Sequence, residues 1–149
     1  LLMMHTLAHV LIKELTFSCG YGSASLRERL YCNLEDPSQP MQGILIYTAS
    51  GDSEGTLGGL VSQARPGQFE RLVSEGLRRA SWCSNDPVCI ESPSTGAGTS
   101  NLAACHACTL LPETSCEEGN RLLDRALLIG TIEDPSVGFL SSAVGSASV

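Results

Sequence analysis

The sequence has few aromatic residues, few basic residues and no long apolar run. Phe, Trp and Tyr make up 5% of its 149 residues, so a core must be built mainly from Leu, Ile, Val and Ala. Lys and Arg number 9 against 16 Asp and Glu, which gives a net charge of −7. A protein that binds nucleic acid by itself usually carries a basic face, so the negative net charge argues against strong DNA binding by this chain alone. No apolar stretch is long enough to cross a bilayer, and we expect no membrane partner.

Several catalytic motifs are also missing. The metalloprotease pattern needs a glutamate directly after its first histidine, but Thr6 follows His5. The glycine-rich segment 55–60 lacks the lysine of a phosphate loop, so it indicates nucleotide binding only weakly. No G-x-S-x-G occurs, and no H-x-E precedes the cysteine pairs as in zinc deaminases. We therefore expect no catalytic residue and no enzyme activity in this chain.

What the chain does contain is seven cysteines, four of them in two close pairs. Cys83 and Cys89 form one pair, Cys105 and Cys108 the other, and a Ser-, Pro- and Gly-rich loop separates them. Tetrahedral zinc takes four thiolate or imidazole donors, which two such pairs supply. We predict one structural Zn²⁺ site held by these four residues. The alternatives are four buried core thiols, or a C-x-x-C redox pair, which the preceding loop and Pro112 disfavour.

The remaining candidates for metal ligation are less well placed in the sequence. Cys116 is the first substitute for one of the four ligands, and His106 is the second. Cys19 and Cys32 lie in other predicted elements and are expected to be core thiols. An odd number of cysteines, with no recognisable signal peptide before them, fits a reducing cytosol better than a secreted disulfide framework. We expect a cytoplasmic protein.

Hydrophobic periodicity predicts an α/β or α+β fold, with a small sheet flanked by helices. The expected elements are a helix over 1–19, a short helix or a strand over 26–31, a strand over 43–48, a short helix after 56, a helix over 68–82, a short helix from 101 and a helix from 114 to about 129. Residues 1–130 are expected to form one domain. Residues 131–149 show no periodicity and are expected to be a poorly ordered tail.

Helical periodicity is already running at Leu1, and we interpret the chain as a C-terminal domain of a longer protein. His5, His9 and Thr16 lie along the edge of the apolar arc of this first helix. We expect the two histidines to bind no metal and to lie near an interface with a preceding segment or a partner.

Several motifs in the same order resemble the MrfA-like zinc-binding domain. They are His5-Thr6-Leu7-Ala8-His9, Gly43-Ile44-Leu45-Ile46-Tyr47, Asp52-x-Glu54-Gly55-Thr56-Leu57-Gly58-Gly59-Leu60, Asp86-Pro87-x-Cys89, Asn101-Leu102-Ala103-Ala104-Cys105-His106-Ala107-Cys108, Pro112-Glu113-Thr114-Ser115-Cys116-Glu117 and Asn120-Arg121-Leu122-Leu123-Asp124-Arg125. The resemblance is closest to the DrmB branch of that family, found in DISARM anti-phage systems. It implies a four-cysteine zinc site at Cys83, Cys89, Cys105 and Cys108. The segment 48–50 departs from the aspartate-glycine of helicase-linked relatives.

The resemblance also implies a place beside a superfamily-2 DNA helicase, as its C-terminal domain or in its partner subunit. We therefore expect a non-catalytic, zinc-stabilised accessory domain that serves a helicase in anti-phage defence and reaches DNA through the complex. A protein–protein docking scaffold without DNA contact is the alternative. A C-x-x-C redox domain is a further, weaker one.

Overall fold

The computed structural model describes residues 1–33, 38–49, 59–96, 98 and 100–145. The first half of the chain forms helix α1 (Leu2–Cys19), strands β1 (Leu26–Asn33) and β2 (Met41–Thr48), and helices α2 (Gly59–Gln63) and α3 (Gln68–Ala80). The second half holds the 3₁₀ turn η2 (Glu113–Ser115), helix α4 (Ala126–Ile129), the 3₁₀ turn η3 (Pro135–Val137) and helix α5 (Ser141–Gly145). The α+β prediction is confirmed, with one two-stranded antiparallel sheet among these residues.

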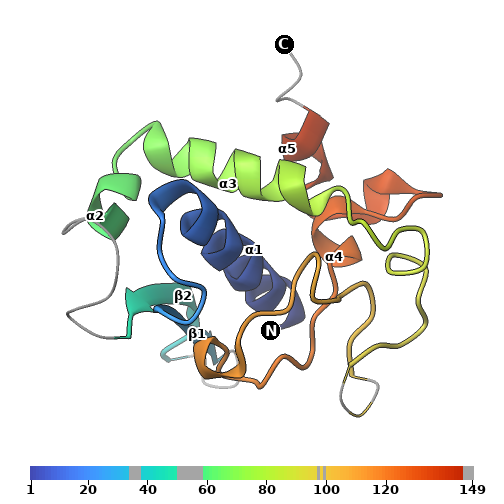
Figure 1. Ribbon diagram of the computed structural model, residues 1–149, viewed down its shortest axis with the longest axis horizontal. Coiled ribbons are helices and arrows are strands. Elements are labelled where there is room, and N and C mark those ends of the chain that lie inside the picture. The colour runs from blue at the N-terminus through green and yellow to red at the C-terminus, as the bar shows by residue number, and fades with distance from the viewer. Residues whose placement is uncertain (34–37, 50–58, 97, 99, 146–149) are drawn as a thin grey trace.

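Helix α1 is the centre of the molecule. Figure 1 shows it between α3 on one side and the β1–β2 hairpin on the other, with the long loops of the second half beside it. Its apolar positions Ala8, Leu11, Ile12 and Leu15 are buried, as the spacing predicted. The helix ends at Gly20, whose φ of 71° lies in the left-handed region that favours glycine.

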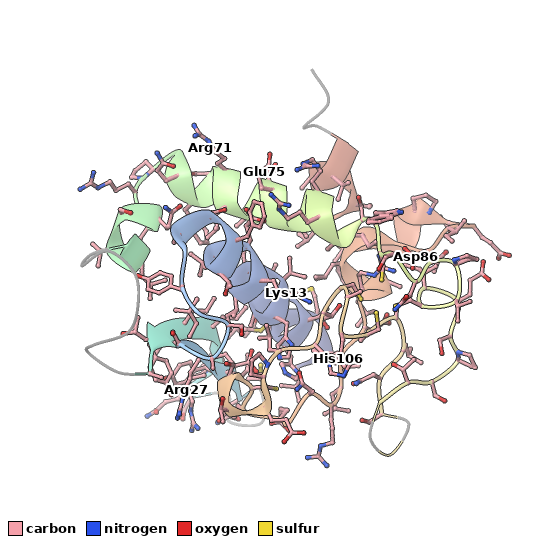
Figure 2. All side chains as sticks on the ribbon, in the orientation of Figure 1. Lys13, Arg27, Arg71, Glu75, Asp86 and His106 are labelled. Carbon is pink, nitrogen blue, oxygen red and sulfur yellow. The ribbon has the colours of Figure 1, made fainter. Side chains whose placement is uncertain are left out.

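Helix α3 is strongly amphipathic and packs against α1. Leu72, Leu77 and Ala80 are buried, whereas Arg71 and Glu75 point away from α1 (Figure 2). Gly76 allows the close approach, because a Cβ at this position would lie 3.1 Å from Val10 Cγ1. Phe69 also falls on the expected apolar face, yet it is half exposed, because it sits in the first turn beyond the reach of α1.

The segment 26–31 is a strand, so the prediction of a short helix there is wrong and its alternative is right. The burial pattern alternates: Leu26 and Glu28 are buried, and Arg27 and Arg29 are exposed. That period of two is the strand period, and it decides between the helix and the strand that the sequence left open. The strand pairs antiparallel with β2, from Leu26 opposite Thr48 to Asn33 opposite Met41.

Two predicted helices of the second half are also wrong. No helix starts at Asn101, which instead pairs with Thr95 in an isolated antiparallel bridge. The helix expected over 114–129 is reduced to the single turn of α4. Gly119, Asn120 and Leu122 interrupt it, with φ values of 60°, 59° and 60°, which an α-helix cannot contain. The stop at Gly130 is as predicted.

The poorly ordered tail expected over 131–149 stays a prediction. Residues 135–145 form η3 and α5, and Leu140, Ala143 and Val144 pack against the cluster formed by α1, α3 and α4. This apolar group spans too few residues to give a periodic signal. A domain boundary near residue 130 stays a proposal.

Segments 34–37, 50–58 and 146–149 lie outside the described residues, as do Ala97, Thr99 and most of the glycine-rich motif 55–60.

Candidate metal centres

The four paired cysteines come together at one end of α3. Their sulfur atoms lie within 4.8 Å of one another. The measured separations are 3.5 Å for Cys83–Cys105, 3.7 Å for Cys89–Cys108 and 3.7 Å for Cys105–Cys108. Thiolates bound to one tetrahedral zinc at about 2.3 Å lie about 3.8 Å apart. The cluster therefore has the dimensions of a tetrahedral four-thiolate site.

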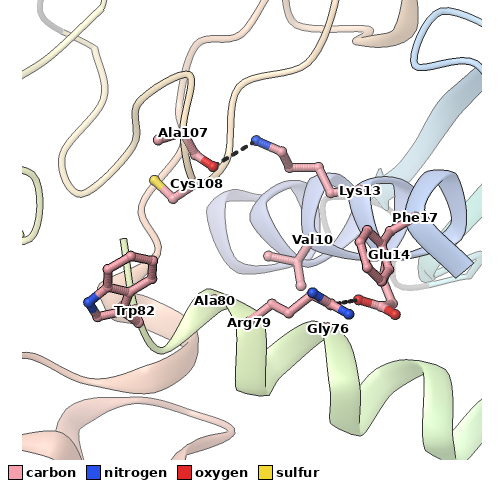
Figure 3. A pocket seen from close by; sticks show the side chains of 10 residues that line it. All are labelled: Val10, Lys13, Glu14, Phe17, Gly76, Arg79, Ala80, Trp82, Ala107 and Cys108. Carbon is pink, nitrogen blue, oxygen red and sulfur yellow. Dashed lines mark hydrogen bonds and ion pairs between the residues drawn. The ribbon is translucent and has the colours of Figure 1, made fainter. Parts of the chain in front are cut away.

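Backbone turns and α1 hold the second cysteine pair in place. The amides of Cys108, Thr109 and Leu110 all donate to the Cys105 carbonyl, which closes a tight turn. Lys13 Nζ, from α1, donates to the carbonyls of His106 and Ala107 at 3.0 and 3.3 Å, and Figure 3 shows the contact with Ala107. This lysine also places a positive charge beside a cluster of thiols.

A buried ion pair holds the loop of the first cysteine pair. Asp86 lies between Cys83 and Cys89, and its Oδ2 accepts the Cys83 amide at 2.9 Å. Its Oδ1 lies 2.5 Å from Arg125 Nη2, and Arg125 also donates to the Ala80 carbonyl at 2.8 Å. Arg125 is fully buried. One guanidinium thus joins the end of α3, the cysteine loop and the start of α4.

The thiols do not all ionise with equal ease. Burial raises the pKa of Cys83 to about 11 and also raises that of Cys89. Burial opposes ionisation of Cys105 as well, but hydrogen bonds from the Cys108 and Ala107 amides and from Asn85 lower its pKa to about 6. Four thiolates this close need a divalent cation among them, so the donor set fits zinc.

The other cysteine and histidine candidates lie apart from this cluster. His106 is exposed on the Cys105–Cys108 turn, and Cys32 is exposed on the hairpin rather than in a core. Cys19 is partly buried against the α1 core, as expected. Cys116, the first substitute ligand, belongs to a different group of side chains.

That second group consists of His5, His9, Glu28 and Cys116. Their ligand atoms also lie within 4.8 Å of one another. His5 Nε2 is 3.2 Å from Cys116 Sγ and 3.1 Å from Glu28 Oε1, and His9 Nε2 is 3.4 Å from the same oxygen. The His5, His9 and Glu28 side chains have 0% exposure. The expectation that the histidines lie at an interface is therefore wrong, because they face inward, toward β1 and the loop after η2.

Charges in this second group stabilise one another. Burial lowers the pKa of His5, but contacts with Cys116 and Glu28 outweigh it and raise the value to about 9. Burial raises the pKa of Glu28, but the two histidines outweigh it and lower the value to about 2. Burial likewise opposes ionisation of Cys116, and the histidines bring its pKa to about 7. Glu28 is therefore a carboxylate at neutral pH, and Cys116 ionises more readily than an ordinary thiol.

Sequence reasoning placed His5 and His9 on one helical face but found neither of their partners. Glu28 lies in the segment 26–31, for which a helix and a strand were both open, and Cys116 lies near the start of the helix predicted over 114–129, which does not form there. The signal that could have found Glu28 is the alternation Leu26-Arg27-Glu28-Arg29, which puts a carboxylate at a buried strand position. No local pattern links positions 28 and 116.

Comparison with known proteins identifies the family. The family model of the MrfA Zn-binding domain matches residues 7–109. The chain belongs to the MrfA Zn-binding domain family. A DISARM protein DrmB from Bacillus paralicheniformis is 46% identical over 131 residues, which cover 88% of this chain and 22% of that protein. The chain thus spans about a fifth of the length of the relative it matches.

Family membership assigns zinc as the cofactor of this MrfA Zn-binding domain, and the four-cysteine cluster accords with it. All four of those cysteines lie within the matched segment 7–109. His5 and Cys116 lie outside it, so the second cluster extends beyond the part of the chain that the family model describes.

A shallow groove of about 200 Å³ runs beside the cysteine cluster, between α1 and α3. Figure 3 shows Lys13, Phe17, Arg79 and Trp82 around it, with Cys108 at one end. Phe17 and Trp82 are each 69% exposed, and the Arg79 guanidinium stacks 3.8 Å above the Phe17 ring. Among the described residues, no helix is long and apolar enough to cross a membrane.

Proposed function

We propose that this domain is a non-catalytic, zinc-stabilised accessory domain in anti-phage defence, with Cys83, Cys89, Cys105 and Cys108 as the zinc ligands. The observation that carries the proposal is the closed four-sulfur cluster inside the family segment. A zinc that takes all four ligands from the protein has no open position for water or substrate, which is typical of structural sites. The similarity to the DISARM protein DrmB supports the role in defence.

We further propose that the domain serves a DNA helicase, either as part of the same chain or in a partner subunit, in the cytoplasm. The chain itself is acidic, with a net charge of −7, which disfavours strong DNA binding by the domain alone. Three cationic side chains, Lys13, Arg78 and Arg79, lie near the groove, where Arg78 pairs with Glu75 and Arg79 with Glu14. DNA contact would therefore be made through the assembled complex, with this region contributing a few phosphate contacts.

A pure docking scaffold without DNA contact is the second candidate. The exposed Trp82 and Phe17 favour it, because aromatic residues next to arginine are the commonest anchors of protein interfaces. A redox role for the Cys105–Cys108 pair is less well supported, since two further thiols lie within 4.8 Å of it and would compete for the same sulfur atoms.

One set of measurements tests these proposals. The purified chain should contain zinc, lack ATPase and nuclease activity, and bind duplex DNA weakly at physiological salt. Co-expressed with the helicase encoded beside it, it should form a complex that binds DNA more tightly than the helicase alone. Complex formation without any change in DNA affinity would favour the docking scaffold. Metal-free, reduced protein with an intact fold would contradict the zinc site.

A further inference from the structure

We propose that His5, His9, Glu28 and Cys116 form a second metal site, which binds one Zn²⁺ or a similar divalent transition metal. These residues come from three separate parts of the fold: one face of α1, the inner face of β1 and the loop after η2. Two imidazoles, one carboxylate and one thiolate are a ligand set that zinc accepts readily.

The distances match a tetrahedral site. Zinc at about 2.0–2.1 Å from nitrogen or oxygen and about 2.3 Å from sulfur puts neighbouring ligand atoms about 3.3–3.6 Å apart. The separations here are 3.2 Å for His5 Nε2 to Cys116 Sγ, 3.1 Å for His5 Nε2 to Glu28 Oε1, and 3.4 Å for His9 Nε2 to Glu28 Oε1. All four ligand atoms lie within 4.8 Å of one another.

Hydrogen bonds around the cluster orient its ligands as they do in metal sites. The His9 Nδ1–H donates to the Thr109 carbonyl at 3.0 Å, which directs the Nε2 lone pair into the cluster. The Asn120 amide donates to Cys116 Sγ at 3.1 Å and so favours its thiolate. The Glu117 amide donates to Glu28 Oε1 at 3.3 Å.

A network of hydrogen bonds alone does not account for the group. His9 Nε2 and Glu28 Oε2 are buried and have no hydrogen-bond partner. Buried polar atoms are nearly always paired; His9 Nε2 is one of the proposed ligand atoms, and Glu28 Oε2 belongs to the carboxylate that supplies another. With neutral imidazoles, the four ligands carry a charge of −2, which a divalent cation neutralises.

The second site would stabilise the packing of the N-terminal half, as the four-cysteine site stabilises the loops after α3. It fixes α1 to the hairpin and to the chain after η2, across separations of 23 residues between His5 and Glu28 and 111 residues between His5 and Cys116. The cluster is enclosed, with His5, His9 and Glu28 fully buried, so the site would be structural.

The test measures metal content and the atoms that surround the metal. The purified chain is loaded with excess zinc under reducing conditions and separated by gel filtration. We expect two zinc equivalents in the wild-type protein. X-ray absorption should then show an average shell of five sulfur atoms to three nitrogen or oxygen atoms per two metals. This measurement needs no variant, so a variant that fails to fold does not affect it.

Variants then assign the second equivalent. His5→Gln with His9→Gln, or Cys116→Ser alone, should reduce the content from two equivalents to one and leave an all-sulfur shell. The matched controls are His106→Gln and Cys32→Ser, whose side chains are exposed and outside both clusters; both should keep two equivalents. A wild-type protein that holds one equivalent in an all-sulfur shell, with the histidine and Cys116 variants unchanged from it, would overturn the proposal.

Discussion

Arg125 is the largest fully buried side chain among the described residues. Its guanidinium lies within hydrogen-bonding reach of the Asp86 carboxylate and the Ala80 carbonyl, 2.5 and 2.8 Å away. Asp86 in turn accepts the amide of Cys83, one of the four clustered cysteines. A single charged side chain therefore sets the position of the first cysteine pair relative to α3.

Replacing Arg125 by Met should lower the free energy of unfolding by about 2–4 kcal/mol. Removing one partner of a buried ion pair leaves the other charge and a carbonyl without a partner, which is the costly case. Arg121→Met is the matched control, because Arg121 is exposed and, among the residues that the structure describes, hydrogen-bonds only the Glu118 carbonyl. Urea unfolding of both variants measures the difference, and equal midpoints would contradict this role of Arg125.

Cys108→Ser should remove the zinc held by the four cysteines and destabilise the domain by several kcal/mol. Structural zinc contributes its binding free energy, on the order of 10–16 kcal/mol in zinc-finger peptides, directly to folding. Cys32→Ser changes an exposed thiol that lies near Met4 and in neither cluster, and should retain both metal and stability. Elemental analysis and thermal melting check this. Full zinc content in Cys108→Ser would mean that Cys108 is not a ligand.

At the scale of elements, the contact between α1 and α3 depends on the absence of a side chain at Gly76. Gly76→Val should destabilise the domain by about 1–3 kcal/mol, because its first carbon would already lie 3.1 Å from Val10 Cγ1. Gly76→Val by itself raises helix propensity, so a loss of stability must come from the clash; Arg71→Val, on the exposed face of the same helix, lowers helix propensity and adds no clash. If chemical denaturation gives the two variants equal stability, the packing argument fails.

The sequence predicted those elements whose periodicity runs over several turns. Helices α1 and α3 were predicted within two residues at each end, since their buried positions repeat every three or four residues. The segment after Cys83 was predicted poorly. Side-chain hydrogen bonds replace regular structure there: Asn101 holds Leu123 and Asn120 holds Leu111 across loops, and no local pattern encodes such pairs.

The four-cysteine cluster could be predicted because its ligands come in two close pairs. The second cluster could not, because His5, Glu28 and Cys116 are far apart in sequence, and each has an ordinary local explanation. The same holds for Arg125 and Asp86, whose pairing depends on the fold. A site can be predicted from sequence when its side chains are close together along the chain. It cannot be predicted in this way when only the fold brings them together.

At the scale of the whole molecule, residues 83–125 contain almost no regular structure and depend on the cysteine cluster and a few buried side chains. Removing metal with a chelator should therefore increase amide hydrogen exchange first in residues 83–109. Helix α3 should stay protected longer, since its apolar face still packs on α1. Exchange followed by mass spectrometry resolves these segments. A uniform loss of protection over the whole chain would instead indicate that zinc and the helical core unfold as one unit.

The exposed aromatic residues beside the cysteine cluster bear on assembly rather than on folding. Trp82 is 69% exposed at the edge of the groove shown in Figure 3, so Trp82→Ala should leave zinc content and melting temperature unchanged. It should weaken binding to the proposed helicase partner by about tenfold or more, because exposed tryptophan beside arginine is typical of interface hot spots. Phe139→Ala is the matched control, since Phe139 is equally exposed but does not line the groove. Titration of each purified variant against the partner gives the affinities. Equal affinities for wild type and Trp82→Ala would exclude this groove as the docking surface, whereas equal losses in both variants would point to a non-specific effect of removing surface aromatics.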